Sequence, residues 1–351
     1  MSADVPLELE MIDEPADRHQ IDGEFVLEVE DLAVSFPSED GVVRAVRGVS
    51  YGVRANEVLG IVGESGSGKS VSMLAVMGLL PRNAQIQGSI RFRGGEMLTM
   101  NERALRSIRG ARVAMIFQDP MTSMNPVLSV GYQLVEAVLA HQDVTKDQAK
   151  DRAVELLTLV GIPNADARVN SYPHEFSGGM RQRAMIAMAM ANDPDVLIAD
   201  EPTTALDVTI QAQVLEVLLE IQEVTGTAIV LITHDLGVVA RVAHRVVVMY
   251  AGEAVETGTV DDLFEQPTHP YTLGLLRSLP RVDGERELLR PIPGSPPSLI
   301  HPPSGCAFHP RCELAQPRCR TEATALHAVA GSAQLSACHF ADDLVRGEVG
   351  S

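Results

Sequence analysis

The residue pattern most suited to chemistry is a glycine-rich loop, GESGSGKS, at residues 63–70. A short apolar run at 58–62 precedes it, and an apolar segment follows until Pro81, so strand, loop and helix are expected in that order. Glycines let successive backbone N–H groups curl round a phosphate, and a helix N-terminus adds a positive dipole end. Lys69 can reach the β- and γ-phosphates of a nucleotide, and the Ser70 hydroxyl can bind Mg²⁺. The predicted phosphate site consists of Gly63, Glu64, Ser65, Gly66, Ser67, Gly68, Lys69, Ser70 and Val71.

Three polar residues follow two other apolar runs that suit buried strands. Asp200 and Glu201 come directly after residues 196–199, and His234 comes just after residues 228–232. Ligands of open α/β sheets bind at the carboxyl ends of the strands, so these side chains are expected beside the phosphates. Asp200 can hold Mg²⁺ through its water shell, and Glu201 can accept a proton from an attacking water. The alternatives are a solvated turn for the acidic pair and a structural role for His234.

Two further features suit a nucleotide. Ser177, Gly178 and Gly179 stand at the start of a segment rich in Ala and Met, which predicts another helix N-terminus that faces an anion. Phe36 ends an alternating apolar run and could stack on an adenine. An ordinary core aromatic at a strand end is an equally good interpretation of Phe36.

All four cysteines lie close together near the C-terminus, at positions 306, 312, 319 and 338. In a reducing compartment such a group indicates metal ligation before disulfides. Four soft ligands suit zinc or an iron–sulfur cluster, but structural zinc sites usually contain close CxxC pairs, which this chain lacks. Reduced thiols without a metal are the third possibility, and His309 and His339 are possible substitute ligands. The cysteine ligands would be Cys306, Cys312, Cys319 and Cys338.

The elements that must position these residues divide the chain into three parts. Residues 1–24 hold eight acidic residues and one Arg, which predicts a solvated, mobile tail. Residues 25–265 are expected to form an α/β domain, with an antiparallel layer first, buried strands such as VAMIF before Gln118, and a helix capped by Thr145 and Gln148. Residues 266–351 are expected to form a C-terminal extension, in which residues 280–303 contain seven prolines, too many for a regular element.

The composition limits the classes of partner. The chain carries 28 Lys and Arg against 47 Asp and Glu, a net charge of -19, which argues against a nucleic-acid partner. No apolar run approaches the ~18 residues of a membrane-spanning helix, and the acidic N-terminus does not suit a signal peptide. A soluble intracellular protein is expected, so that any contact with a membrane comes through a partner.

The order and spacing of these motifs resemble the nucleotide-binding subunit of an ATP-binding cassette (ABC) transporter. The resemblance implies a P-loop NTPase with a RecA-like parallel-sheet core, an antiparallel β subdomain and a helical subdomain. Two such domains clamp two ATP molecules, and the phosphate loop and Glu201 of one face the FSGGM signature of the other. The signature usually begins with Leu and ends with Gln, where this chain has Phe176 and Met180. By resemblance, Gln118 contacts Mg²⁺ and the γ-phosphate and links them to the permease, His234 orients water, and Asp207 joins the nucleotide site.

Four segments look like the oligopeptide and dipeptide importer ATPases: FQDPMTSMNP, HEFSGGMRQR, HPYTLGLLRSLP and the cysteine tail. This branch implies uptake of di- and oligopeptides through two integral membrane permease subunits. A second, related ATPase chain and an extracellular substrate-binding protein complete the system, with this chain at the cytoplasmic face of the membrane. A nickel chelate or glutathione is the alternative substrate. In this branch the cysteine pattern is associated with a 4Fe–4S cluster, which favours the cluster over zinc.

A non-transport ABC ATPase, acting in DNA repair or on ribosomes, is the other class considered. Such proteins usually carry two cassettes in one chain or a long coiled-coil insertion. This chain has one cassette and no sustained heptads, so the transport interpretation is preferred. A redox sensor built on the cysteine tail is a further alternative.

Overall fold

The computed structural model describes residues 23–118, 123–204, 206–279 and 291–346. Several expectations lie outside the described residues: the acidic tail up to residue 22, positions 119–122 after Gln118, Ala205 of the Ala-Leu-Asp motif, and residues 280–290 of the proline-rich stretch.

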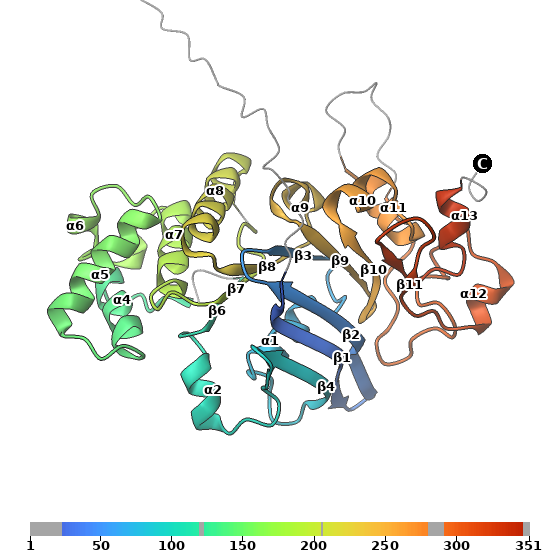
Figure 1. Cartoon of the computed structure of the whole chain (residues 1–351), viewed down its shortest axis with the longest axis horizontal. Helices are drawn as coiled ribbons and strands as arrows, with labels where there is room; N and C mark the ends of the chain where they lie inside the picture. Colours follow the sequence, from blue (N-terminus) through green and yellow to red (C-terminus); the bar gives the residue numbers. More distant parts are fainter. Residues whose placement is uncertain (1–22, 119–122, 205, 280–290, 347–351) are drawn as a thin grey trace, which may run out of the picture.

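The predicted antiparallel layer is formed by four strands in the order β2-β1-β4-β5 (Figure 1). They are β1 (Phe25–Ser38), β2 (Gly41–Arg54), β4 (Gln85–Phe92) and β5 (Gly95–Glu96). Alternate apolar side chains such as Leu27, Val29 and Ile90 are buried, and they pack in one core with Met73 of the helix after the phosphate loop. One face of the layer therefore packs against the helix that follows the phosphate loop.

The second sheet has a core of five parallel strands in the order β9-β3-β8-β7-β6. Their bounds are β3 (Val58–Val62), β6 (Val113–Ile116), β7 (Val196–Asp200), β8 (Ala228–Thr233) and β9 (Arg245–Tyr250). Every residue of β3, β7 and β8 is buried, as continuous apolar runs predict for a sheet covered on both faces. Because the strands are parallel, the loop after β3 and the residues after β7 and β8 leave the sheet at the same edge.

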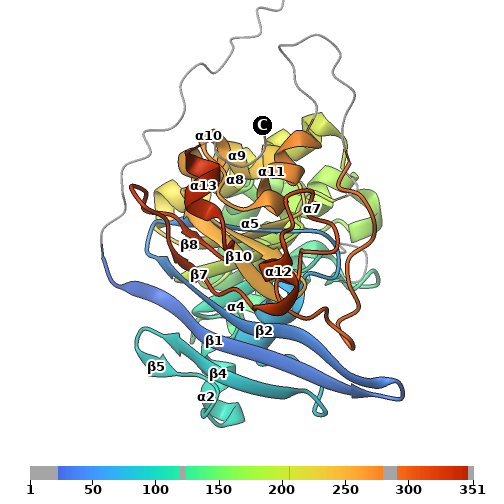
Figure 2. The same ribbon diagram turned by 90° about the vertical axis from the view of Figure 1, so that its right-hand side faces the viewer.

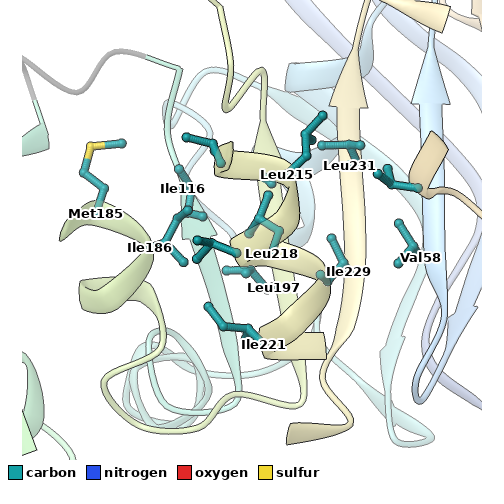
Figure 3. Packing of buried hydrophobic residues seen from close by; sticks show 14 of the residues in the cluster. Val58, Ile116, Met185, Ile186, Leu197, Leu215, Leu218, Ile221, Ile229 and Leu231 are labelled. Carbon is teal, nitrogen blue, oxygen red and sulfur yellow. The ribbon is translucent and has the colours of Figure 1, made fainter. Parts of the chain in front are cut away.

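Helices cover this sheet. The group next to it comprises α1 (Lys69–Val76), α8 (Val208–Thr225), α9 (Leu236–Val242) and α10 (Val260–Glu265). Figure 3 shows Leu215, Leu218 and Ile221 of α8 directed toward strand residues such as Leu197 and Ile229. The apolar segment after the loop does not stay helical as far as Pro81. Helix α1 ends at Val76, because Gly78 takes a positive φ of 59° two residues later.

A helical group follows β6 and lies to one side of the sheets (Figure 1). It contains α4 (Val130–Leu139), α5 (Lys146–Leu159), α6 (Ala165–Arg168), the 3₁₀ turn Pro173–Glu175 and α7 (Gly178–Ala189), while α2 (Glu102–Ile108) lies near the antiparallel layer. The predicted capping box is confirmed, since the Thr145 side chain accepts from the Gln148 N–H and Gln148 reaches back to the Thr145 N–H.

The C-terminal extension packs at the opposite side, beside β10 (Glu253–Thr259) (Figure 2). Its elements are α11 (Pro270–Arg277), α12 (Pro317–Thr321), β11 (His327–Ala328), β12 (Leu335–Ser336) and α13 (Ala341–Val345). Strand β12 pairs with β10, and the Ala337 N–H donates to the Val255 carbonyl at 2.8 Å. The extension thereby covers an edge of the main sheet. None of the helices in the described ranges is both long and apolar enough to cross a bilayer.

Candidate functional site

The glycine-rich loop leaves β3 in a conformation that only glycine accommodates at two positions. Gly63 has φ 154°, and a Cβ there would lie 2.1 Å from the Met249 carbonyl oxygen. Gly68 has φ 100°, and its Cβ would lie 2.4 Å from the Ala45 carbonyl oxygen. The loop can therefore lie closely against the end of β9 and against β2 only because these residues lack a side chain.

Lys69 begins α1 and turns back into the loop. Its Nζ donates to the carbonyl oxygens of Gly63 at 2.7 Å and Glu64 at 3.0 Å, and its side chain is 5% exposed. Burial lowers the pKa of Lys69, and the carboxylates of Glu201, Asp200 and Glu64 oppose that shift. The ammonium is thus held at the centre of the loop beside three negative groups, where an incoming phosphate can replace the carbonyl contacts.

Ser70 and Asp200 form a pair of oxygen donors next to the lysine. The Ser70 Oγ donates to the Asp200 Oδ1 at 3.1 Å, and Asp200 ends the buried strand β7. Burial raises the pKa of Asp200, while the Ser70 hydrogen bond lowers it. A hydroxyl and a carboxylate oxygen are hard ligands of the type that Mg²⁺ prefers, so the donor set fits this ion.

Glu201 is held by contacts from three directions. Its Oε2 accepts from Gln118 Nε2 at 3.1 Å and from Thr204 Oγ1 at 2.8 Å, and its Oε1 lies 3.4 Å from His234 Nδ1. Glu201 itself has φ 48°, an uncommon value for a residue other than glycine and one that clusters at functional sites. The sequence-predicted Gln118, Glu201 and His234 therefore meet, and Thr204, which we did not predict, joins them. Its only sequence signal is its position in the EPTT segment.

The signature residues lie elsewhere. Ser177 caps α7 by accepting from the Met180 N–H at 3.3 Å, and Ser177 and Gly178 are both exposed. Gly179 lies against Ile210 of α8. Within the described parts of the chain, no hydrogen bond or ion pair joins this segment to the phosphate loop. The phosphate loop and this helix N-terminus are therefore separate features of one chain, and contact of the signature with a nucleotide stays a prediction.

Two other predicted residues have local structural contacts. Asp207 is the N-cap of α8, where its side chain accepts from the Ile210 N–H at 3.0 Å. Phe36 pairs with Val43 near the end of the β1–β2 ribbon and is partly buried against the core. Contact of either residue with a nucleotide stays a prediction.

The four cysteines, which lie close together in the sequence, also come together in the structure. Cys306, Cys312, Cys319 and Cys338 line one small cavity together with Phe308, His309 and His339. All four are free thiols, and burial is the main cause that raises the pKa of Cys312 to about 11 and that of Cys338 to about 12. Among the residues that the structure describes, no group of three or more His, Cys, Asp or Glu side chains is arranged so that it could hold a metal ion.

A strand, a glycine-rich loop with Lys69 and Ser70, and an acidic pair at the end of a neighbouring parallel strand define a P-loop nucleoside triphosphatase. The ABC transporter family model matches residues 46–204, and the model of the oligopeptide/dipeptide transporter C-terminal region matches residues 255–319. The chain belongs to the ABC transporter family, as an ATP-hydrolysing subunit of its oligopeptide/dipeptide transporter branch.

Individual relatives match over most of the chain. The oligopeptide transport ATP-binding protein OppD of Bacillus subtilis is 55% identical over 83% of this chain and 82% of its own length. The dipeptide transport ATP-binding protein DppD of Escherichia coli is 51% identical over 90% of this chain and 96% of its own length.

Solved cassettes share the fold. The cassette MJ0796, in a dimeric post-hydrolysis state with ADP and Pi, has a TM-score of 0.60 at 23% identity and covers 67% of this chain and 98% of its own. CbiO1 from Clostridium perfringens is part of the ABC transporter complex CbiONQ. It has a TM-score of 0.60 at 26% identity, and the match covers 70% of this chain and 92% of CbiO1. These likenesses support the predicted RecA-like core with its antiparallel and helical subdomains.

Proposed function

We propose that the chain hydrolyses ATP to energise uptake of di- and oligopeptides through separate membrane permease subunits. The observation that carries this proposal is the match to relatives named for oligopeptide and dipeptide transport, which extends over most of both chains. The match to the C-terminal region of such transporters supports it independently of the nucleotide site. An extracellular substrate-binding protein would deliver the peptide to the permease.

The chain acts in a pair with a second, related ATP-binding subunit, at the cytoplasmic face of the membrane. The exposed Ser177 and Gly178, which do not contact their own phosphate loop, support this pairing because they can serve the nucleotide bound by the partner. Closure of the pair on ATP and its opening after hydrolysis would move the permease between its inward- and outward-facing states.

Within this proposal each residue of the site has one role. Loop N–H groups and Lys69 neutralise the phosphates, and Ser70, Asp200 and Gln118 would hold Mg²⁺. This ion, when bound, neutralises charge on the β- and γ-phosphates. Glu201 takes the proton of the attacking water, since its carboxylate is fixed by Thr204 and Gln118. His234, next to Glu201, orients that water.

Peptide uptake by cells tests the substrate. In a host that lacks its own copy of this gene, the unaltered chain is expected to restore accumulation of a labelled tripeptide, because ATP hydrolysis drives the permease. An excess of unlabelled dipeptide or tripeptide should compete for entry. Competition by glutathione or a nickel chelate, with no effect of peptides, would contradict the peptide assignment while leaving the ATPase assignment intact.

We propose further that the cysteines of the extension hold a 4Fe–4S cluster. All four thiols line the same cavity, which supports a common ligand. Four cysteine thiolates are the usual ligands of such a cluster. Structural zinc sites usually contain close CxxC pairs, which this chain lacks.

Spectroscopy of anaerobically purified protein distinguishes the possibilities. The expected result is broad visible absorption that bleaches on reduction, with about four iron and four sulfide ions per chain. The Cys319→Ser variant should lose the visible absorption and the bound iron and sulfide, because it lacks one of the four ligands. One equivalent of zinc without iron would assign the site to zinc, and absence of both metals would leave four reduced thiols.

A further inference from the structure

The extension contacts the nucleotide site through a bidentate ion pair between Arg311 and Glu64. Arg311 Nη1 donates to Glu64 Oε2 at 2.6 Å, and Nη2 donates to Glu64 Oε1 at 2.9 Å. Glu64 is the second residue of the phosphate loop, and 247 positions separate it from Arg311. The side chains are only 5% and 26% exposed, so solvent screens this pair weakly.

The surroundings of Arg311 fix its guanidinium. Its Nε donates to the Pro293 carbonyl at 2.9 Å, and Nη1 donates to the Tyr250 hydroxyl at 3.4 Å. The Tyr250 ring packs against Phe308 at a centroid distance of 5.2 Å. The cation is therefore held in place by the extension and by the end of β9.

The backbone of Glu64 is held as well. Its N–H donates to the hydroxyl of Tyr271 at 2.9 Å, and Tyr271 is a fully buried residue of α11. The Glu64 carbonyl accepts from Lys69 Nζ at 3.0 Å. A continuous set of contacts thus runs from Arg311 and Tyr271 through Glu64 to the lysine of the phosphate loop.

Because Glu64 is negatively charged, its contact with Arg311 affects how the loop receives a nucleotide. A carboxylate in a loop that must receive a triphosphate repels it, and the field of Glu64 reaches Lys69, where it opposes the effect of burial on the pKa. Arg311 donates to both oxygens of Glu64, and its positive charge compensates that of the carboxylate.

We propose that Arg311 and Tyr271 are positioning residues of the nucleotide site: the extension neutralises Glu64 and holds the phosphate loop in the form that nucleotide enters. Neither residue touches the reacting atoms. The C-terminal extension is then a working part of the ATPase, in addition to any ligand that its cysteines hold.

The test is the affinity of the full-length subunit for Mg-ATP, measured by calorimetry. Arg311→Met is expected to bind about tenfold more weakly, because Glu64 is left with an uncompensated charge beside the phosphates. Its KM for ATP should rise while kcat at saturation stays close to that of the unaltered chain. In Glu64→Gln/Arg311→Met no such charge remains, so the affinity should recover to within about threefold. Arg346→Gln, which removes an exposed ion pair of the extension with Asp343, serves as the matched control and should bind normally.

Two results would overturn the proposal: unchanged affinity in Arg311→Met, or a double variant as weak as the single one, which indicates a merely structural loss. If Arg311→Met yields no folded protein, Tyr271→Phe tests the same loop from its backbone side. That variant loses only the hydroxyl that accepts from Glu64, and it should bind Mg-ATP about threefold more weakly. Normal binding by Tyr271→Phe would then reject the positioning role.

Discussion

Glu201→Gln is expected to bind ATP as tightly as the unaltered chain and to hydrolyse it about a hundred- to ten-thousandfold more slowly. The amide has nearly the shape of the carboxylate and can still accept the Thr204 hydrogen bond, but it cannot take a proton from water. Nucleotide binding rests on the loop and Lys69, which the substitution does not touch. The paired subunits should therefore close on ATP and remain closed.

Single-turnover hydrolysis and calorimetry separate the two effects. Glu223→Gln, the same substitution at an exposed position of α8, is the matched control and should change neither quantity. Near-normal turnover in Glu201→Gln would remove Glu201 from the role of base. Loss of binding and turnover together would indicate that the strained backbone at this position, φ 48°, had collapsed.

Lys69→Ala is expected to weaken binding of both ATP and ADP by roughly tenfold to a hundredfold. The ammonium is buried in the loop and donates to the Gly63 and Glu64 carbonyls, so the substitution removes a cation and both of these hydrogen bonds, while the Glu64 carbonyl keeps the Ser67 N–H at 3.2 Å. The charge that remains near the phosphates is then dominated by Asp200 and Glu201, which repel them.

Calorimetry with Mg-ADP provides the readout, since ADP binding does not depend on hydrolysis. Lys150→Ala makes the same substitution on the exposed face of α5, and this variant should bind Mg-ADP as the unaltered chain does. An unchanged affinity in Lys69→Ala would contradict phosphate binding by this loop.

Much of the site could be predicted because its signals are local. The run 58–62 matches the observed bounds of β3, and Asp200 lies where the apolar run before it indicates, at the end of β7. The capping box of Thr145 and Gln148 depends on neighbouring residues alone, so it too could be read from the sequence. Parallel pairing then brings Glu201 and His234 to one edge of the sheet.

Other features depend on tertiary packing, which the sequence does not encode locally. Helix α1 ends before Pro81 at the left-handed Gly78, and Arg109, from a distant segment, donates to the Met77 and Gly78 carbonyls that the helix end leaves open. The pairing of Arg311 with Glu64 depends on how the extension folds back over β10. No spacing rule connects such residues, so only a three-dimensional structure reveals them.

The most direct measurement is ATP hydrolysis by this subunit reconstituted with its partner ATPase and permease in vesicles, with peptide accumulation followed in parallel. The predicted result is Mg²⁺-dependent phosphate release that rises when a peptide-loaded binding protein is added, together with entry of the peptide. Phosphate release that ignores the loaded binding protein while no peptide enters would contradict the proposed function.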